Sequence, residues 1–209
     1  MKLLIGSRNN NVPAKYLENR NSFQTGDLVL YRGTSLLSKS IQYFDKAYYN
    51  HIGVVWKDDD MDRILTLDMW SGGLACLPLS RRMSGYADFC VLRPRVSEAR
   101  SNAAIKEVLS YWDGREVKYD NMLLLRIALI KKTGIDITGL GKSDKFVCSE
   151  FVQYYTNLLG IETYSKVNLI TPEDFRRYID NNFVVMYDDA PAPDRSFKGK
   201  RIRLGGYSI

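Results

Sequence analysis

The order of strand-like and helix-like segments is the feature that most constrains the fold of this 209-residue chain. Short apolar runs that predict strands occur at 28–32, 51–56, 64–70, 88–94 and 182–189. Segments with helical spacing occur at 35–43, 97–112, 119–132, 146–159 and 171–179, so that most of them come later in the chain. Strands that precede most of the helices favour the α+β class, with an antiparallel sheet packed against helices on one side.

The composition fits one domain with two extensions. Hydrophobic residues make up 45% of the chain, enough for a sizeable core. We expect an N-terminal arm at 1–24, a domain at 25–187 and a basic C-terminal tail at 188–209. The net charge of +6 predicts a mildly cationic surface that suits an anionic partner such as a cell wall or a lipid surface. No basic patch interleaved with aromatic residues indicates a nucleic-acid platform, so we expect no nucleic-acid partner.

Metal and membrane functions find little support in the sequence. There is one histidine, and the three cysteines form no CxxC pair, which makes a zinc hydrolase improbable. We expect no cofactor. The apolar run near Met1 is too short for a signal peptide, and MLLLRIALI is too short to span a bilayer. The expected location is the cytoplasm or a virion.

His51, the single histidine, stands at the start of the apolar run HIGVVW. The plain interpretation is a partly buried side chain bonded to backbone. If HIGVVW and ILTLDMW pair around a turn centred on Asp59 and Asp60, His51 lies directly opposite Asp68. An aspartate there could accept the imidazole N–H and raise its basicity. The alternative for Asp68 is a solvent-facing carboxylate on a half-buried strand.

Cys148 falls in the first turn of the helix predicted at 146–159. A thiol there meets the positive end of the helix dipole and free backbone N–H groups, which favour the thiolate and can hold an oxyanion. The alternative is a small buried thiol, which fits Cys76 and Cys90 better. A thiol, a histidine and an acid are together the parts of a thiol hydrolase.

Six motifs in this order resemble the permuted NlpC/P60 papain-like proteins of the YiiX/YaeF-like group. They are GDLVLYRG, YNHIGVVW, an acid-bearing strand, YD before an apolar helix, FVCSEFV and TPEDF. The resemblance spans Gly26 to Phe175 and implies a permuted papain-like fold, an antiparallel sheet or small barrel packed against helices.

The resemblance also implies roles for individual residues. It assigns the nucleophile to Cys148, the base to His51 and a substrate-binding tyrosine near the pocket to Tyr119. The third polar residue, often glutamate in that group, falls on Asp68, which is shorter by one methylene.

Three functions remain open from the sequence. The first is a cysteine amidase or peptidase that hydrolyses a peptidoglycan-type peptide or another small amide through a Cys148 thioacyl intermediate. The second is a lipid-directed acyl hydrolase or acyltransferase that uses the same cysteine and histidine. The third is a non-catalytic binding or structural module on this scaffold. The sequence does not indicate an oligomeric state.

Overall fold

The sheet is the centre of the computed structural model, which describes residues 12–34, 38–39, 42–43, 46–70, 73–112, 118–120, 145–161, 163, 170–177 and 182–191. Within these residues six strands pair antiparallel in the order β4-β3-β2-β1-β5-β8. They are β1 (Leu28–Tyr31), β2 (His51–Asp58), β3 (Arg63–Trp70), β4 (Gly73–Pro78), β5 (Phe89–Pro94) and β8 (Phe183–Asp188). The α+β class and five predicted strands are confirmed, and β4 is a strand that the sequence did not predict.

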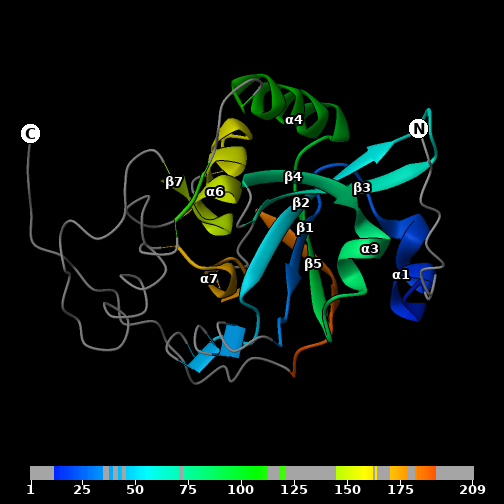
Figure 1. Ribbon diagram of the computed structural model, residues 1–209. Coiled ribbons are helices and arrows are strands. Elements are labelled where there is room, and N and C mark those ends of the chain that lie inside the picture. The colour runs from blue at the N-terminus through cyan, green and yellow to red at the C-terminus, as the bar shows by residue number, and fades with distance from the viewer. Residues whose placement is uncertain are drawn as a thin grey trace, which may run out of the picture.

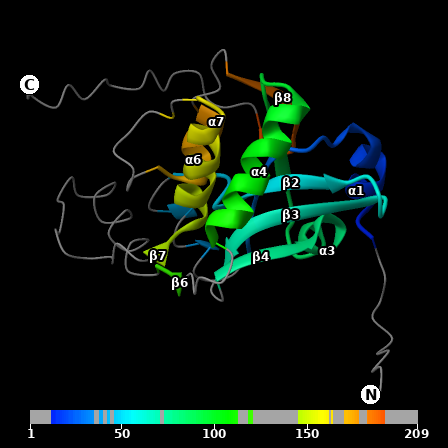
Figure 2. The ribbon, with the colours of Figure 1, turned by 90° about the horizontal axis from the view of Figure 1, so that it is seen from above.

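Helices cover both faces of the sheet (Figures 1 and 2). One face packs against α4 (Glu98–Trp112), α6 (Cys148–Leu158) and α7 (Pro172–Arg177). The other packs against α1 (Ala14–Asn19) and α3 (Leu79–Met83). The prediction of helices on one side was therefore wrong. The sequence of β1 already indicated cover on both faces, because a strand of four apolar residues in a row has an apolar side chain on each face. All four of these residues are buried.

The N-terminal segment from residue 12 packs on the sheet. After α1 the chain forms the short 3-10 helix η1 (Arg20–Ser22). Tyr16 and Phe23 belong to the same buried cluster as Val29 of β1. Lys15 also reaches across to the Asp189 carboxylate at 2.8 Å. The boundaries of the arm and of the tail stay predictions.

The helix that begins at Cys148 starts and ends close to its predicted limits. Phe146, predicted as its first residue, instead belongs to β7 (Lys145–Phe146), which pairs parallel with β6 (Lys118–Tyr119). Gly160, with φ of 71°, ends α6 in the left-handed conformation that glycine tolerates best, as predicted.

Some predicted segments lie outside the described residues. This holds for 121–132 of the apolar helix, for most of the helix at 35–43 and for the basic tail beyond residue 191. Among the helices that the structure describes, none is long and apolar enough to cross a membrane.

Candidate active site

The hairpin of β2 and β3 brings His51 and Asp68 together, although not in the predicted register. Val54 pairs with Leu67 and Asp58 with Arg63, a shift of two residues from the prediction. The turn occupies the four residues 59–62 and closes with Asp62 in the left-handed conformation (φ 47°). A shift of two keeps every side chain on its predicted face. Asp68 therefore still faces the same side as His51, and the His51 Nε2 lies 3.5 Å from the Asp68 Oδ2.

His51 and Asp68 are not directly opposite each other in the observed register, and Gly53 leaves room for their contact. Continued by one residue, the observed register puts Gly53 opposite Asp68. A Cβ at Gly53 would lie 2.7 Å from the Thr66 Oγ1 and 3.0 Å from both the Asp68 Cβ and the Leu67 carbonyl oxygen. A glycine inside a strand commonly marks such a close approach. The missing side chain thus leaves the space through which the Asp68 carboxylate reaches His51.

We expect Gly53→Ala to separate Asp68 from His51. The added methyl group must displace Thr66 or Asp68, at a cost of about 1–3 kcal/mol in the free energy of unfolding. Because His51 is the single histidine, its imidazole NMR signal can be titrated without overlap. Its midpoint should fall from about 9 in the parent protein toward the ordinary value of about 6.5.

Gly85→Ala is the matched control. A Cβ at Gly85 meets only the Arg82 carbonyl oxygen, at an ordinary contact distance of 3.5 Å. This variant should keep the parent stability and the parent His51 titration. An unchanged His51 midpoint in Gly53→Ala would contradict the assigned role of Gly53.

Cys148 is the first residue of α6 and is buried, with 2% of its surface exposed. The first backbone hydrogen bond of this helix runs from the Phe151 N–H to the Val147 carbonyl. The N–H groups of Cys148 and the two residues after it therefore precede the helical ladder, where they carry the positive end of the helix dipole. The Glu150 carboxylate accepts the Val147 N–H at 3.1 Å and fixes the start of the helix.

The His51 ring interacts with both Cys148 and Asp68. Burial alone would lower the pKa of His51, but the Cys148 sulfur and the Asp68 carboxylate outweigh it and raise that pKa to about 9. The Nε2 makes no directed hydrogen bond to a described residue, so the 3.5 Å contact with Asp68 is an ion-pair contact. The imidazole thus has an acid and a thiol as its neighbours.

Asp68 is fully buried and stays ionised. Burial alone would raise the pKa of Asp68, but His51 and Arg82 hold it below its ordinary value. Arg82 comes from α3 and grips the carboxylate with two N–H groups. The predicted alternative of a solvent-facing carboxylate is therefore wrong.

Aromatic rings surround the imidazole on the side of the sheet that α3 covers. The Tyr86 ring is parallel to the His51 ring within 4°, with centroids 6.1 Å apart. Trp70 meets His51 edge-on at 5.6 Å, and Tyr31 is tilted against it at 5.8 Å. These contacts restrict the ring to one orientation.

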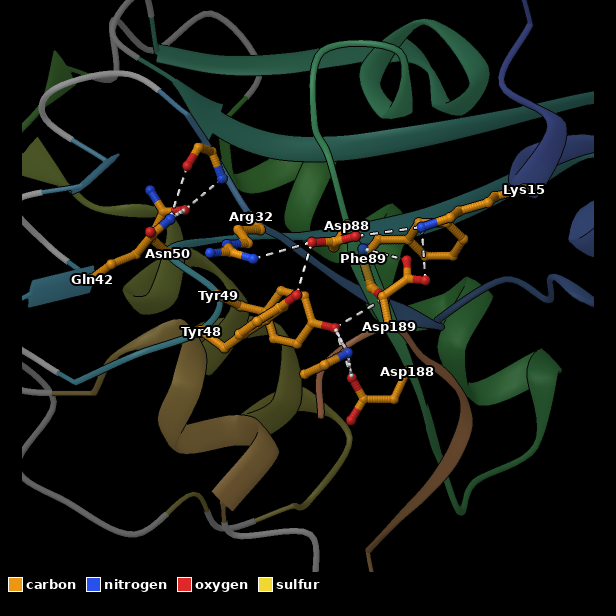
Figure 3. Close-up of polar contacts among 12 residues, drawn as sticks. Lys15, Arg32, Gln42, Tyr48, Tyr49, Asn50, Asp88, Phe89, Asp188 and Asp189 are labelled. Carbon is orange, nitrogen blue, oxygen red and sulfur yellow. Dashed lines mark hydrogen bonds and ion pairs between the residues drawn. The ribbon is translucent and has the colours of Figure 1, made fainter. Parts of the chain in front are cut away.

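Polar contacts also fix the segment that leads into His51 (Figure 3). The Tyr48 hydroxyl donates to Asp88 at 2.8 Å, and the Tyr49 hydroxyl donates to Asp188 at 2.7 Å. The Asn50 Oδ1 accepts the Gly33 N–H at 2.7 Å. The strand that carries His51 thus begins from an anchored backbone.

The remaining predicted residues lie in different surroundings. The backbone of Tyr119 pairs with Phe146, two residues before Cys148, and its substrate-binding role stays a prediction. Cys90 is fully buried in β5, where burial raises its pKa, and Cys76 lies on β4. Cys90 fits the small buried thiol expected of it, whereas Cys76 is exposed, so that expectation was wrong for Cys76.

Two features of the site were missed by the sequence analysis. Gly53 could have been found from its place inside an apolar strand. Arg82 gave no such signal, because LSRRM reads as an ordinary surface segment. A buried aspartate requires a partner, but the sequence does not say which cation supplies it.

Comparisons with known proteins agree with this fold. The structure is similar to the crystal structure of the metalloprotein YiiX from Escherichia coli O157:H7, with a TM-score of 0.58 and 16% sequence identity. The similarity covers 80% of this chain and 98% of that one. The likeness to a YiiX-type, permuted papain-like fold is thus confirmed. No protein-family model matches the sequence, and no curated protein does either.

Proposed function

We propose that this protein is a cysteine hydrolase that cleaves an amide bond, with Cys148 as nucleophile, His51 as acid and base, and Asp68 as the group that orients His51. The observation that carries the proposal is that the buried His51 ring interacts with both the Cys148 sulfur and the Asp68 carboxylate. The YiiX-like fold supports a hydrolase of this general type, and the resemblance to wall-directed peptidases suggests peptidoglycan-type peptides as substrates.

The reaction follows from the placement of these groups. The Cys148 thiolate attacks the amide carbon, and the N–H groups at the start of α6 are positioned to bind the oxyanion. The His51 imidazolium donates its proton to the leaving amine, and a thioester with Cys148 remains. Neutral His51 then takes a proton from water, which attacks the thioester and releases the acid and the thiolate.

The residues of this site do not suit a metal ion, although YiiX is described as a metalloprotein. Both Asp68 oxygens are bound by Arg82, so a metal would have to displace a guanidinium. Within the described residues, no group of three or more potential metal-binding side chains is arranged to hold an ion.

The pH dependence of Cys148 alkylation by iodoacetamide tests the proposal without a known substrate. Peptide mass spectrometry can follow the three free cysteines separately, so that Cys76 and Cys90 serve as internal controls. We expect Cys148 labelling to have a midpoint well below about pH 8.5, the value of an ordinary thiol. His51 should stay charged up to about pH 9, so the thiolate–imidazolium form should persist to that pH.

His51→Ala should move the labelling midpoint of Cys148 up to the ordinary thiol range. The midpoint is the readout because restricted access of the reagent slows labelling at every pH by the same factor and leaves the midpoint in place. A parent protein whose Cys148 titrates like an ordinary thiol, unchanged by His51→Ala, would refute the proposal.

A further inference from the structure

Arg82 holds the Asp68 carboxylate that also contacts His51. Its Nε donates to the Asp68 Oδ2 at 2.7 Å, and its Nη2 donates to the Oδ1. This two-bond fork fixes the plane of the carboxylate, which one donor could not do. The guanidinium is itself placed by the Trp70 ring, 4.5 Å from its central carbon.

One carboxylate oxygen faces both partners. The Oδ2 accepts the Arg82 Nε–H and lies 3.5 Å from the His51 Nε2. Any rotation of the carboxylate that broke the fork would also change its distance from the imidazole. A change in the position of Arg82 would therefore change the distance between the Asp68 carboxylate and the His51 ring.

The charges of the buried groups balance only when Arg82 is present. Asp68 has no exposed surface, and a buried carboxylate without a cation readily takes up a proton. The charges of Arg82 and Asp68 cancel each other. A proton can therefore move between Cys148 and His51 while the four side chains keep a net charge of zero. Without Arg82, a charged pair would leave one net negative charge in the interior.

Among the described residues, Glu150 of α6 is an acid two residues from Cys148, and burial raises its pKa to about 7. Three further titratable groups around the pair are neutral near pH 7. They come from β1, from β4 and from the segment after α3. Burial raises the pKa of each of them: Tyr31, Cys76 and Tyr86. Arg82 is thus the cation beside Asp68 that stays charged whether or not His51 carries a proton.

We propose that Arg82 is a positioning residue, which keeps Asp68 ionised and aimed at His51 and thereby sets the pH range over which Cys148 and His51 form a charged pair. The inference rests on the proposed function, because it concerns the same pair. It goes further by extending the site to a fourth residue on a separate helix.

Alkylation of Cys148 across the pH range tests this proposal in four variants of Arg82 and Asp68. In Arg82→Met, the labelling midpoint should rise by about one pH unit, since one opposite charge within a few ångströms shifts a titration by that order. Arg82→Lys keeps the charge and loses the fork, so its midpoint should stay closer to the parent. In Asp68→Asn, adding Arg82→Met should produce no further rise, because Arg82 acts through Asp68.

Arg93→Met is the matched control. Arg93 also grips a buried aspartate with two bonds, both of 2.8 Å to Asp27. Asp27 precedes β1, at the opposite end of that strand from Tyr31, which pairs with His51. This variant should lose stability and keep the parent labelling midpoint.

The outcomes separate the two proposals. A folded Arg82→Met protein with the parent midpoint would overturn the role of Arg82, and so would an equal rise with and without Asp68→Asn. If Arg82→Met does not fold, Arg82→Gln takes its place, since its amide can still donate a hydrogen bond to Asp68 while the charge is lost. Its midpoint should rise in the same direction, and a parent midpoint would overturn the role of Arg82. A parent protein without a low midpoint would instead refute the proposed hydrolase.

Discussion

Cys148→Ala is expected to lower amide hydrolysis by at least about 10³-fold, because the nucleophile is lost and only binding and oxyanion stabilisation remain. The measurement is amine release from a panel of peptidoglycan-type peptides, with thermal unfolding to show that the variant folds. Removing one buried sulfur atom leaves the contacts of α6 with the sheet in place, so the unfolding transition should remain cooperative.

Cys76→Ala is the control for this experiment, since Cys76 lies on β4 and is exposed. It should hydrolyse the same peptides at the parent rate. Full activity of Cys148→Ala would exclude the thioester mechanism.

Acyl lipids belong in the same experiment as a second substrate panel. Cleavage of acyl lipids that also depends on Cys148, with wall peptides left intact, would retain the thioester and replace the amide by a lipid substrate. If neither panel is cleaved and Cys148 labels as an ordinary thiol, the scaffold is a binding module.

The sequence predicted which residues belong to the site better than it predicted how those residues pair with one another. Apolar runs located five strands, and helical spacing placed Cys148 in the first turn of α6, because both patterns depend only on local periodicity. The hairpin register was wrong by two residues, since the length of the turn depends on Asp62 entering the left-handed conformation. The side chains nevertheless kept their faces, because strand periodicity repeats every two residues.

Arg82 could not be predicted for a different reason. The α3 helix packs on β3, but Arg82 and Asp68 are 14 residues apart and lie on separate elements. Their contact depends on the packing angle of a five-residue helix, whose one apolar pair, Leu79 and Met83, is too short a pattern to predict that angle. Long-range ion pairs of this kind are a property of the tertiary structure.

Glu173→Ala should be the most destabilising of the substitutions considered, with a loss of about 3–5 kcal/mol in the free energy of unfolding. Glu173 is buried on α7, and its Oε2 accepts the N–H groups of both Tyr48 and Tyr49 at 2.9 Å. Its Oε1 accepts from Arg176 at 3.1 Å. The variant leaves two backbone donors unpaired and takes one carboxylate from a buried guanidinium.

Chemical denaturation at neutral pH measures this loss, and Glu107→Ala is the control because Glu107 is exposed on α4. Glu173→Gln should fall between the two, since its amide oxygen can still accept an N–H but carries no charge for Arg176. A loss below about 1 kcal/mol for Glu173→Ala, the worth of one ordinary hydrogen bond, would contradict the assigned role. Because Tyr48 and Tyr49 lead directly into His51, the same contacts that stabilise the fold also place the imidazole beside Cys148.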